Sequence, residues 1–203
     1  MSAQPGRFIV FEGLDGAGTT TQAQLLAERL RGRGRTVHLA HQPSEGPVGL
    51  LVRQILAGRA ATPQADGKLG MVDERVMALL FAADRLDHLN SQIEPRLARG
   101  EDVFLDRYIL SSLAYQGASV SHDFIQSANR YARKADLTLF LYVPAAIALE
   151  RVKQRGAKLE RYETPQQMQQ IEREYNRLVG TLAKTAIATA MAGITIATGI
   201  FWQ

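Results

Sequence analysis

Hydrophobic and polar positions recur along this chain in two periods, one typical of buried strands and one typical of helices. Runs of β-branched, aromatic and leucine residues bounded by glycine or polar residues predict strands at 7–12, 36–40, 103–105, 137–143 and 194–200. Apolar residues at helical spacing predict helices at 20–30, 46–57, 73–89, 109–115, 124–133 and 144–155, a short one that ends at Gly100, and a last one that runs from 164 past Leu182. Strands and helices therefore alternate along the chain.

This alternation predicts an α/β fold in which a five-stranded parallel sheet is flanked by helices in three layers. The run at 137–143 is apolar at nearly every position, as expected for a strand that is covered on both faces. No repeat or linker divides the sequence, so residues 1–203 are expected to form a single domain. Ligands of such folds bind at the carboxyl ends of the strands.

The composition is that of a globular protein, because 46% of the 203 residues are hydrophobic. The absence of cysteine excludes disulfides and cysteine-based metal sites, and it fits a reducing cytoplasm. The first residues, 1–6, lack the apolar segment of a signal peptide. The net charge is +4, but the arginines are spread over the chain, so we expect phosphorylated small molecules and no nucleic acid as partners.

The end of the chain allows two interpretations. After Lys184, 19 residues carry no charge, and this length is close to that of a membrane span. Alanine, threonine and glycine dominate the segment, however, and these residues are only weakly apolar. We therefore interpret it as the end of a helix followed by the strand at 194–200, and we expect no membrane association.

The first predicted strand leads into a glycine-rich segment that opens the first predicted helix. This segment fits the phosphate-binding pattern G-x-x-x-x-G-K-[ST], in which backbone N–H groups and a helix N-terminus surround phosphate oxygens. The candidate ATP-binding residues are Gly13, Leu14, Asp15, Gly16, Ala17, Gly18, Thr19 and Thr20. The hydroxyl of Thr20 is a candidate Mg²⁺ ligand. An ordinary strand-to-helix turn is the alternative interpretation of the segment.

The segment departs from the pattern at one position, because Thr19 occupies the place of the lysine. A lysine there donates charged hydrogen bonds to the β- and γ-phosphates, and losing one such preorganised donor costs on the order of 10²–10³ in rate. Either another cation replaces it, or the protein is slow, or it is not a kinase.

Four segments occur in an order that resembles bacterial thymidylate kinase, a P-loop nucleoside-monophosphate kinase, over about residues 7–180. They are FEGLDGAG…TTQ at 11–22, FAADR at 81–85, DRY…SSLAYQG at 106–117 and RGAKLERYE at 155–163. The resemblance implies a P-loop kinase fold, a cytoplasmic homodimer, and phosphorylation of dTMP to dTDP by ATP with Mg²⁺ in dTTP biosynthesis. The helix at 73–89 is a candidate for the dimer interface.

The resemblance also implies roles for residues around the acceptor nucleotide. Phe81 would stack on thymine and Arg85, one helical turn later, would bind its O4 atom. Asp15 would accept a hydrogen bond from the sugar 3′-OH, and Tyr115 would crowd the 2′ position. The remaining candidates are base-facing Ser112 and Gln116 and the phosphate-binding Arg107. The alternative interpretations are a core aromatic for Phe81, a solvated helix arginine for Arg85 and polar helix-surface residues for Ser112 and Gln116. For Asp106 and Arg107 the alternative is a structural ion pair at the strand end.

Catalysis would rest on three further residues. By resemblance, Asp106 would organise Mg²⁺ directly or through water, together with Thr20. The segment 155–164 matches the lid of the family, and its Arg155 and Arg161 would stabilise the transferring phosphoryl group, with Lys158 between them. These lid arginines are the natural replacement for the missing lysine. A solvated charged loop is the alternative, and the helix after it should begin at Thr164 as N-cap.

Two further departures from the family bear on function. His41 and Gln42 stand where the family usually has an arginine and a glutamate, and the sequence ends at Gln203, where the family normally continues. Two alternatives to a dTMP kinase therefore stay open. One is a kinase for another nucleotide or deoxynucleoside, and the other is a weak or inactive nucleotide-binding relative.

Overall fold

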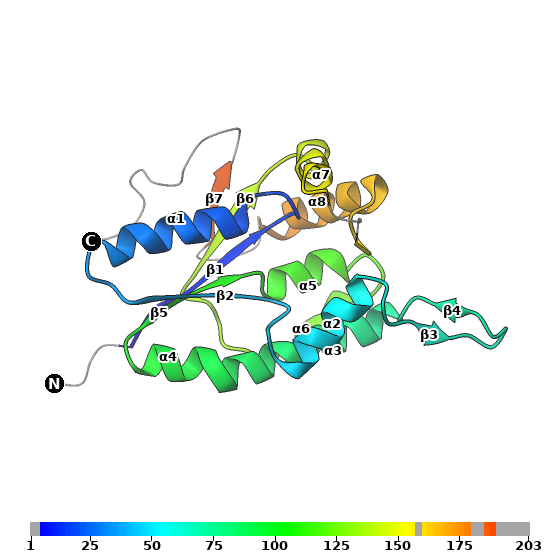
Figure 1. Ribbon diagram of the computed structural model, residues 1–203, viewed down its shortest axis with the longest axis horizontal. Helices are drawn as coiled ribbons and strands as arrows, with labels where there is room; N and C mark the ends of the chain where they lie inside the picture. Colours follow the sequence, from blue (N-terminus) through cyan, green and yellow to red (C-terminus); the bar gives the residue numbers. More distant parts are fainter. Residues whose placement is uncertain (1–4, 157–159, 180–184, 190–203) are drawn as a thin grey trace.

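A single parallel sheet organises the computed structural model of the chain, which describes residues 5–156, 160–179 and 185–189. The strand order is β2-β5-β1-β6-β7, and every neighbouring pair is parallel. The strands are β1 (Phe8–Gly13), β2 (Val37–His41), β5 (Asp102–Asp106), β6 (Leu137–Tyr142) and β7 (Thr185–Thr189). Helices cover both faces of the sheet (Figure 1). The predicted α/β fold is therefore confirmed.

Four of the five predicted strands correspond to β1, β2, β5 and β6. The predicted strand at 194–200 lies outside the described residues. The sheet instead continues with β7, at Thr185–Thr189, where we expected the end of a helix. No helix within the described ranges is both long and apolar enough to cross a membrane.

The alternation of side chains along β1 divides the core into two halves. Ile9 and Phe11 pack on one face with apolar residues of α1 (Thr19–Arg31), and Phe8 and Val10 pack on the other. The second face is covered by the end of a long helical rod. This rod consists of α3 (Glu74–His88), the π-helical turn η1 (Leu89–Ile93) and α4 (Glu94–Ala98). Because β1 is buried on both faces, its carboxyl end lies deep within the fold.

The other helices lie close to their predicted positions. They are α2 (Pro47–Leu56), α5 (Ile109–Tyr115), α6 (His122–Ala128), α7 (Ala145–Gln154) and α8 (Pro165–Val179). The helix expected at 124–133 is α6, which begins and ends earlier, and at its C-cap the side-chain Nδ2 of Asn129 donates to the carbonyl of Ile125 at 2.7 Å. Thr164 caps α8 as predicted, since its Oγ1 accepts from the N–H of Gln167 at 3.3 Å.

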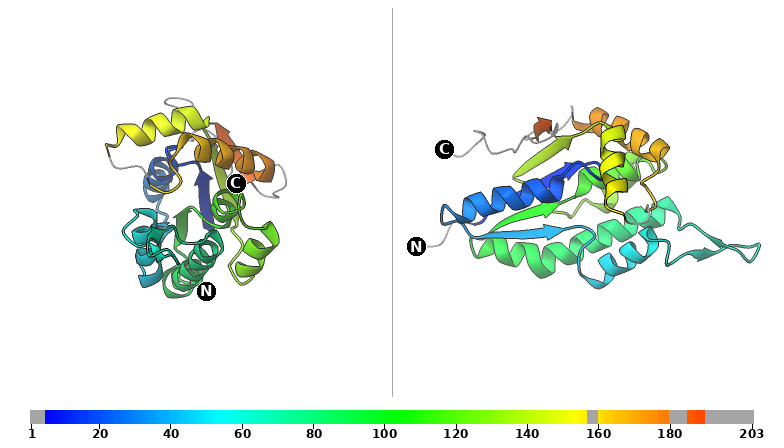
Figure 2. Two further views of the ribbon diagram at one scale, coloured as in Figure 1. Left: turned by 90° about the vertical axis from the view of Figure 1, so that its right-hand side faces the viewer. Right: turned by 45° about the horizontal axis from the view of Figure 1, so that its top comes forward.

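A short hairpin was not expected from the sequence. Its strands β3 (Thr62–Pro63) and β4 (Leu69–Gly70) pair antiparallel between α2 and α3. The hairpin projects away from the sheet in Figures 1 and 2. Its Leu69 is 74% exposed, so the hairpin adds little to the core.

The rod on the second face makes a testable contribution to stability. Leu97, which is 2% exposed, packs against β1 and β5 in the second half of the core. Leu97→Ala is expected to lower the free energy of unfolding by about 2–5 kcal/mol, because it leaves a cavity. Leu69→Ala on the exposed hairpin is the control, with an expected change within about 0.5 kcal/mol. Urea denaturation measures both, and equal losses would contradict this account of the core.

Candidate functional site

The glycine-rich segment forms a loop between the carboxyl end of β1 and the first turn of α1. Gly16 and Gly18 have φ angles of 87° and 93°, which side chains rarely adopt. A Cβ atom on Gly16 would also lie 2.3 Å from the carbonyl oxygen of Ala148. Gly18, the N-cap of α1, supplies no side-chain cap. The loop thus brings backbone to the positive end of a helix, an arrangement that favours anions.

Two cavities lie beside this loop and share Asp15 and Arg107 in their walls. The smaller cavity, about 100 Å³, is lined by the loop, by Asp106 of β5 and by Arg155. The larger cavity, about 250 Å³, is lined by α2, α3 and α5 and by Glu160, Tyr162 and Glu163. A ligand that fills both would therefore pass the Asp15–Arg107 pair.

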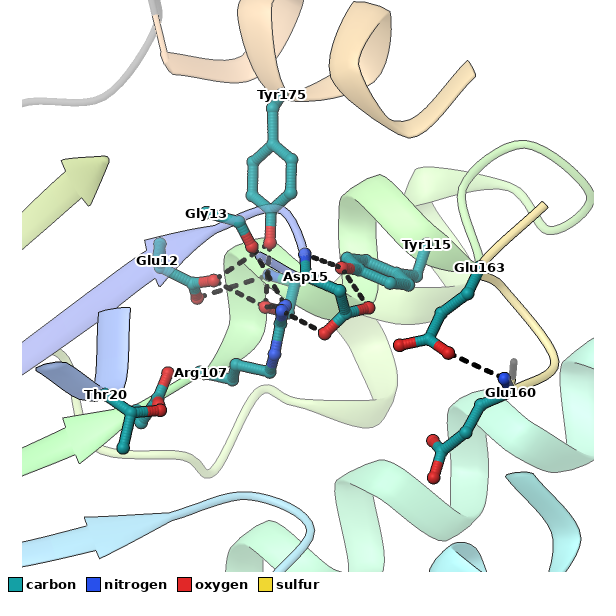
Figure 3. Close-up of polar contacts among 11 residues, drawn as sticks. Glu12, Gly13, Asp15, Thr20, Arg107, Tyr115, Glu160, Glu163 and Tyr175 are labelled. Atoms are coloured by element: carbon teal, nitrogen blue, oxygen red, sulfur yellow. Dashed lines mark hydrogen bonds and ion pairs between the residues drawn. The ribbon is translucent and has the colours of Figure 1, made fainter. Parts of the chain in front are cut away.

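Arg107 follows the last residue of β5 and has a φ of 73°. Its Nη2 lies 2.7 Å from Oδ1 of Asp15, and its Nη1 donates to the carbonyl of Gly13 at 3.0 Å (Figure 3). Burial alone would lower the pKa of Arg107, but Asp15 and, to a smaller extent, the neighbouring Tyr115, Tyr175 and Asp106 together outweigh it, and the pKa is raised well above its usual value. A permanently charged guanidinium thus faces both cavities.

Tyr115 completes the group at the junction of the cavities. Its hydroxyl donates to Oδ2 of Asp15 at 2.9 Å and accepts from the N–H of Asp15 at 3.2 Å. Burial raises the pKa of Tyr115 well above its usual value, so the hydroxyl stays neutral. The guanidinium of Arg107 lies 5.1 Å from the centre of the Tyr115 ring, a cation–π contact.

The residues assigned to the base, and Tyr115, which was assigned to the sugar, line the larger cavity together. They are Phe81, Arg85, Ser112, Tyr115 and Gln116. Arg85, Ser112 and Gln116 are 1%, 3% and 1% exposed, which excludes a solvated helix arginine and polar helix-surface residues. Phe81 lines the cavity and also packs against a small apolar cluster of α2 and α3.

Arg85 is held by oxygen atoms on several sides. Its guanidinium donates to Gln42 Oε1 at 3.1 Å, to the carbonyl of Tyr108 at 3.1 Å, to Ser112 Oγ at 3.0 Å and to Asn129 Oδ1. Burial lowers the pKa of Arg85 to about 10, since none of its hydrogen-bond partners is a carboxylate. Gln42 thus contacts the base-side arginine, whereas His41 is exposed, contacts Glu45 at 3.1 Å and lines neither cavity.

The two candidate lid arginines lie in different environments. Arg155 follows α7 and lines the smaller cavity. Arg161 lines neither cavity, and its Nη2 lies 2.8 Å from Glu74 Oε1 and 2.6 Å from the carbonyl of Val72. Of these two arginines, Arg155 is thus the one that lies beside the phosphate loop, where Arg151 of α7 also donates to the carbonyl of Gly16 at 3.3 Å. Lys158 lies outside the described residues.

The pair expected to organise Mg²⁺ is assembled at the smaller cavity. The hydroxyl of Thr20 donates to Oδ2 of Asp106, while the buried Oδ1 of Asp106 has no hydrogen-bond partner among the described residues. Within those residues, no group of three or more histidine, aspartate or glutamate side chains is placed to hold a metal ion. One carboxylate and one hydroxyl still fit Mg²⁺, which usually keeps several waters and binds substrate phosphates.

Sequence reasoning did not single out three residues that support this site, of which Glu12 and Tyr175 are buried and Ser111 is partly buried. Glu12, Ser111 and Tyr175 form a hydrogen-bonded group directly behind Arg107. Glu12 alone gave a signal in the sequence, since it is a carboxylate in an otherwise apolar strand end. Burial raises the pKa of Glu12, although the hydrogen bonds from Ser111 and Tyr175 and the charge of Arg107 counteract this.

A glycine loop between strand and helix, with an arginine and a carboxylate beside it, defines a protein that binds nucleotide phosphates. The sequence profile described as thymidylate kinase matches residues 11–194. The chain belongs to the thymidylate kinase family.

Relatives along nearly the whole chain agree with this assignment. A probable thymidylate kinase of Thermococcus kodakarensis is 36% identical over 193 residues, which cover 92% of this chain and 91% of the relative. One of Pyrobaculum aerophilum is 42% identical over 157 residues, covering 77% and 74%. A thymidylate kinase of Desulfotalea psychrophila is 35% identical over 180 residues, covering 88% and 84%. The expected bacterial subtype is not supported, because the relatives from Thermococcus kodakarensis and Pyrobaculum aerophilum are archaeal.

Proposed function

We propose that this protein transfers the γ-phosphate of ATP to dTMP and forms ADP and dTDP for dTTP biosynthesis. The observation that carries the proposal is the meeting of two cavities at the Asp15–Arg107 pair. ATP phosphates in the smaller cavity and dTMP in the larger one would meet beside Arg107. An oxygen of the dTMP phosphate then bonds to the γ-phosphorus as its bond to ADP breaks, a reaction that depends on positioning and charge.

The larger cavity offers groups that suit a thymine base. Phe81 supplies a ring surface, and Arg85 supplies N–H donors for a carbonyl oxygen such as O4. Ser112 and Gln116 add hydrogen-bonding groups to the same wall. A cytosine base would present an amino group to Arg85, so the cavity favours bases with a carbonyl at this position.

The junction of the cavities suits a deoxyribose phosphate. Asp15 carries two carboxylate oxygens that accept from Arg107 and Tyr115, and it would also accept from a sugar 3′-OH. The ring of Tyr115 would crowd a 2′-OH and so favour deoxyribose. Arg107 would bind the acceptor phosphate, because its guanidinium matches two phosphate oxygens at once.

Asp106 and Thr20 would hold Mg²⁺, with the unpartnered Oδ1 of Asp106 as the available carboxylate oxygen. The bound ion would neutralise charge that develops on the phosphates. Arg155 would supply the cation that Thr19 cannot, because it lines the same cavity as Thr19. The segment 155–164, within one domain, would act as the lid that excludes water from the transfer. Arg161 would join Arg155 only after leaving Glu74.

The preference for the acceptor base is directly testable. ADP formation from ATP and Mg²⁺ should depend on dTMP, and kcat/KM with dCMP should be about 10–100 times lower, because a buried donor of Arg85 loses its acceptor. dUMP and dAMP complete the series, and Arg107→Gln serves as the inactive control. Equal turnover of all four nucleotides would contradict base recognition. Absence of turnover with each of them would indicate a nucleotide-binding relative without catalysis.

The replacement of the lysine is tested by a double-mutant cycle. Arg155→Ala should lower kcat by about 10²–10³ in the natural chain and by much less in Thr19→Lys, since the lysine restores the lost charge. Arg161→Ala is tested in the same way, and Lys153→Ala on the exposed side of α7 is the matched control. If Arg155→Ala and Arg161→Ala both leave kcat unchanged, the lid does not compensate for Thr19.

We further propose that the protein is a cytoplasmic homodimer that uses α3 and α2 as its interface. Val76 and Leu79 of α3 and Leu50 and Leu51 of α2 are large apolar residues that are 45–52% exposed. Sedimentation velocity should find a dimer of the 22.3 kDa chain, and Leu79→Glu should dissociate it. Ile147→Glu, on α7, is the control that should remain dimeric. A wild-type monomer at micromolar concentration would exclude this assembly.

A further inference from the structure

Glu12 is a buried carboxylate that touches neither of the two cavities. It lies near the end of β1, is 0% exposed and lines neither cavity wall. Its Oε1 accepts from the N–H of Tyr108 at 2.9 Å and of Ser111 at 3.2 Å, and its Oε2 accepts from Ser111 Oγ at 2.5 Å and Tyr175 OH at 3.2 Å. A buried carboxylate is costly unless it is hydrogen-bonded, and these four bonds offset the cost.

The hydrogen bonds of Glu12 first stabilise the turn that carries Arg107. Among the described residues other than glycine, Arg107 alone has a positive φ, and an L side chain adopts this conformation at a cost. Consecutive residues of β1 hold the turn. The carbonyl of Phe11 accepts from the N–H of Arg107 at 2.8 Å, and Glu12 accepts from the N–H of Tyr108. Glu12 thereby also caps the first turn of α5.

Glu12 also determines the side-chain contact of Arg107 with Ser111. A hydroxyl has one hydrogen, and the bond at 2.5 Å directs that of Ser111 to Glu12. The lone pairs of the same oxygen are then free to accept from Nη1 of Arg107 at 3.2 Å. Tyr175, from α8, reaches this centre with its hydroxyl 2.8 Å from Ser111 Oγ (Figure 3).

We infer that Glu12 is a positioning residue of the acceptor site, which holds both the backbone and the guanidinium of Arg107 between the two cavities. Tyr175 is the second support of the same group and joins it to α8, the helix that follows residues 155–164. This inference rests on the proposed function, because Arg107 is there the residue that binds the acceptor phosphate. It predicts that loss of Glu12 weakens dTMP binding more than ATP binding.

Glu12→Gln tests the inference with little change of volume. Its amide nitrogen cannot accept the Ser111 hydrogen, so the hydroxyl turns and Arg107 loses an acceptor. We expect the KM for dTMP and the calorimetric Kd for dTMP alone to rise about 10–100-fold, while the KM for ATP changes less than about 3-fold. Tyr175→Phe should produce a smaller rise in the same direction.

Asp102→Asn is the matched control, because Asp102 is also a carboxylate that is 0% exposed, at the opposite end of the neighbouring strand. It should lower the melting temperature and leave the ratio of the two KM values unchanged. Equal changes of both KM values in Glu12→Gln, or an unchanged Kd for dTMP, overturn the inference. If Glu12→Gln does not fold, Ser111→Ala tests the inference instead, through the same ratio of the KM for dTMP to the KM for ATP. A wild-type protein that binds dTMP without phosphorylating it overturns the proposed function alone.

Discussion

The ion pair between Asp15 and Arg107 is the interaction around which the site is built. The two side chains come from different parts of the sequence, and the parallel pairing of β1 with β5, which aligns Phe11 with Asp106, brings them together. Nη2 of Arg107 lies 2.7 Å from Oδ1 of Asp15. The side chain of Asp15 is 30% exposed and that of Arg107 is 18% exposed, and both lie at the junction of the two cavities. Because they are partly desolvated, each would be costly without the other. The register of two strands therefore decides where a phosphate can bind.

The electrostatic balance of the smaller cavity explains why a missing lysine matters here. Two carboxylates, Asp15 and Asp106, and two guanidinium groups, Arg107 and Arg155, line its wall together with the loop. These formal charges cancel, so a polyphosphate would depend on backbone N–H groups and on added cations. In most P-loops a lysine shifts this balance from within the loop. In this chain we propose that Arg155, which lines the same cavity from outside the sheet, supplies the comparable charge.

The order of the elements followed from the sequence, because period and glycine placement are local signals. Most of the cavity wall followed from the family resemblance, and for Phe81 and Arg85 the period added only that residues one turn apart on α3 share a helix face. β7 and the pairing of Arg161 with Glu74 did not follow, since both depend on contacts between distant segments. The role of Glu12 was missed for the same reason: its partners Ser111 and Tyr175 lie 99 and 163 positions away.

The strand order also divides the site into residues on central strands and residues outside the sheet, and these should differ in how easily they unfold. Glu12 and Asp106 belong to β1 and β5, which have a neighbouring strand on each side. We expect their backbone N–H groups to exchange with solvent only when the sheet unfolds. Arg155 and Glu160 lie outside the sheet, so we expect them to open at lower cost. Gentle heating is therefore expected to displace Arg155 and Glu160 while Glu12, Asp106 and the Arg107 turn stay in place.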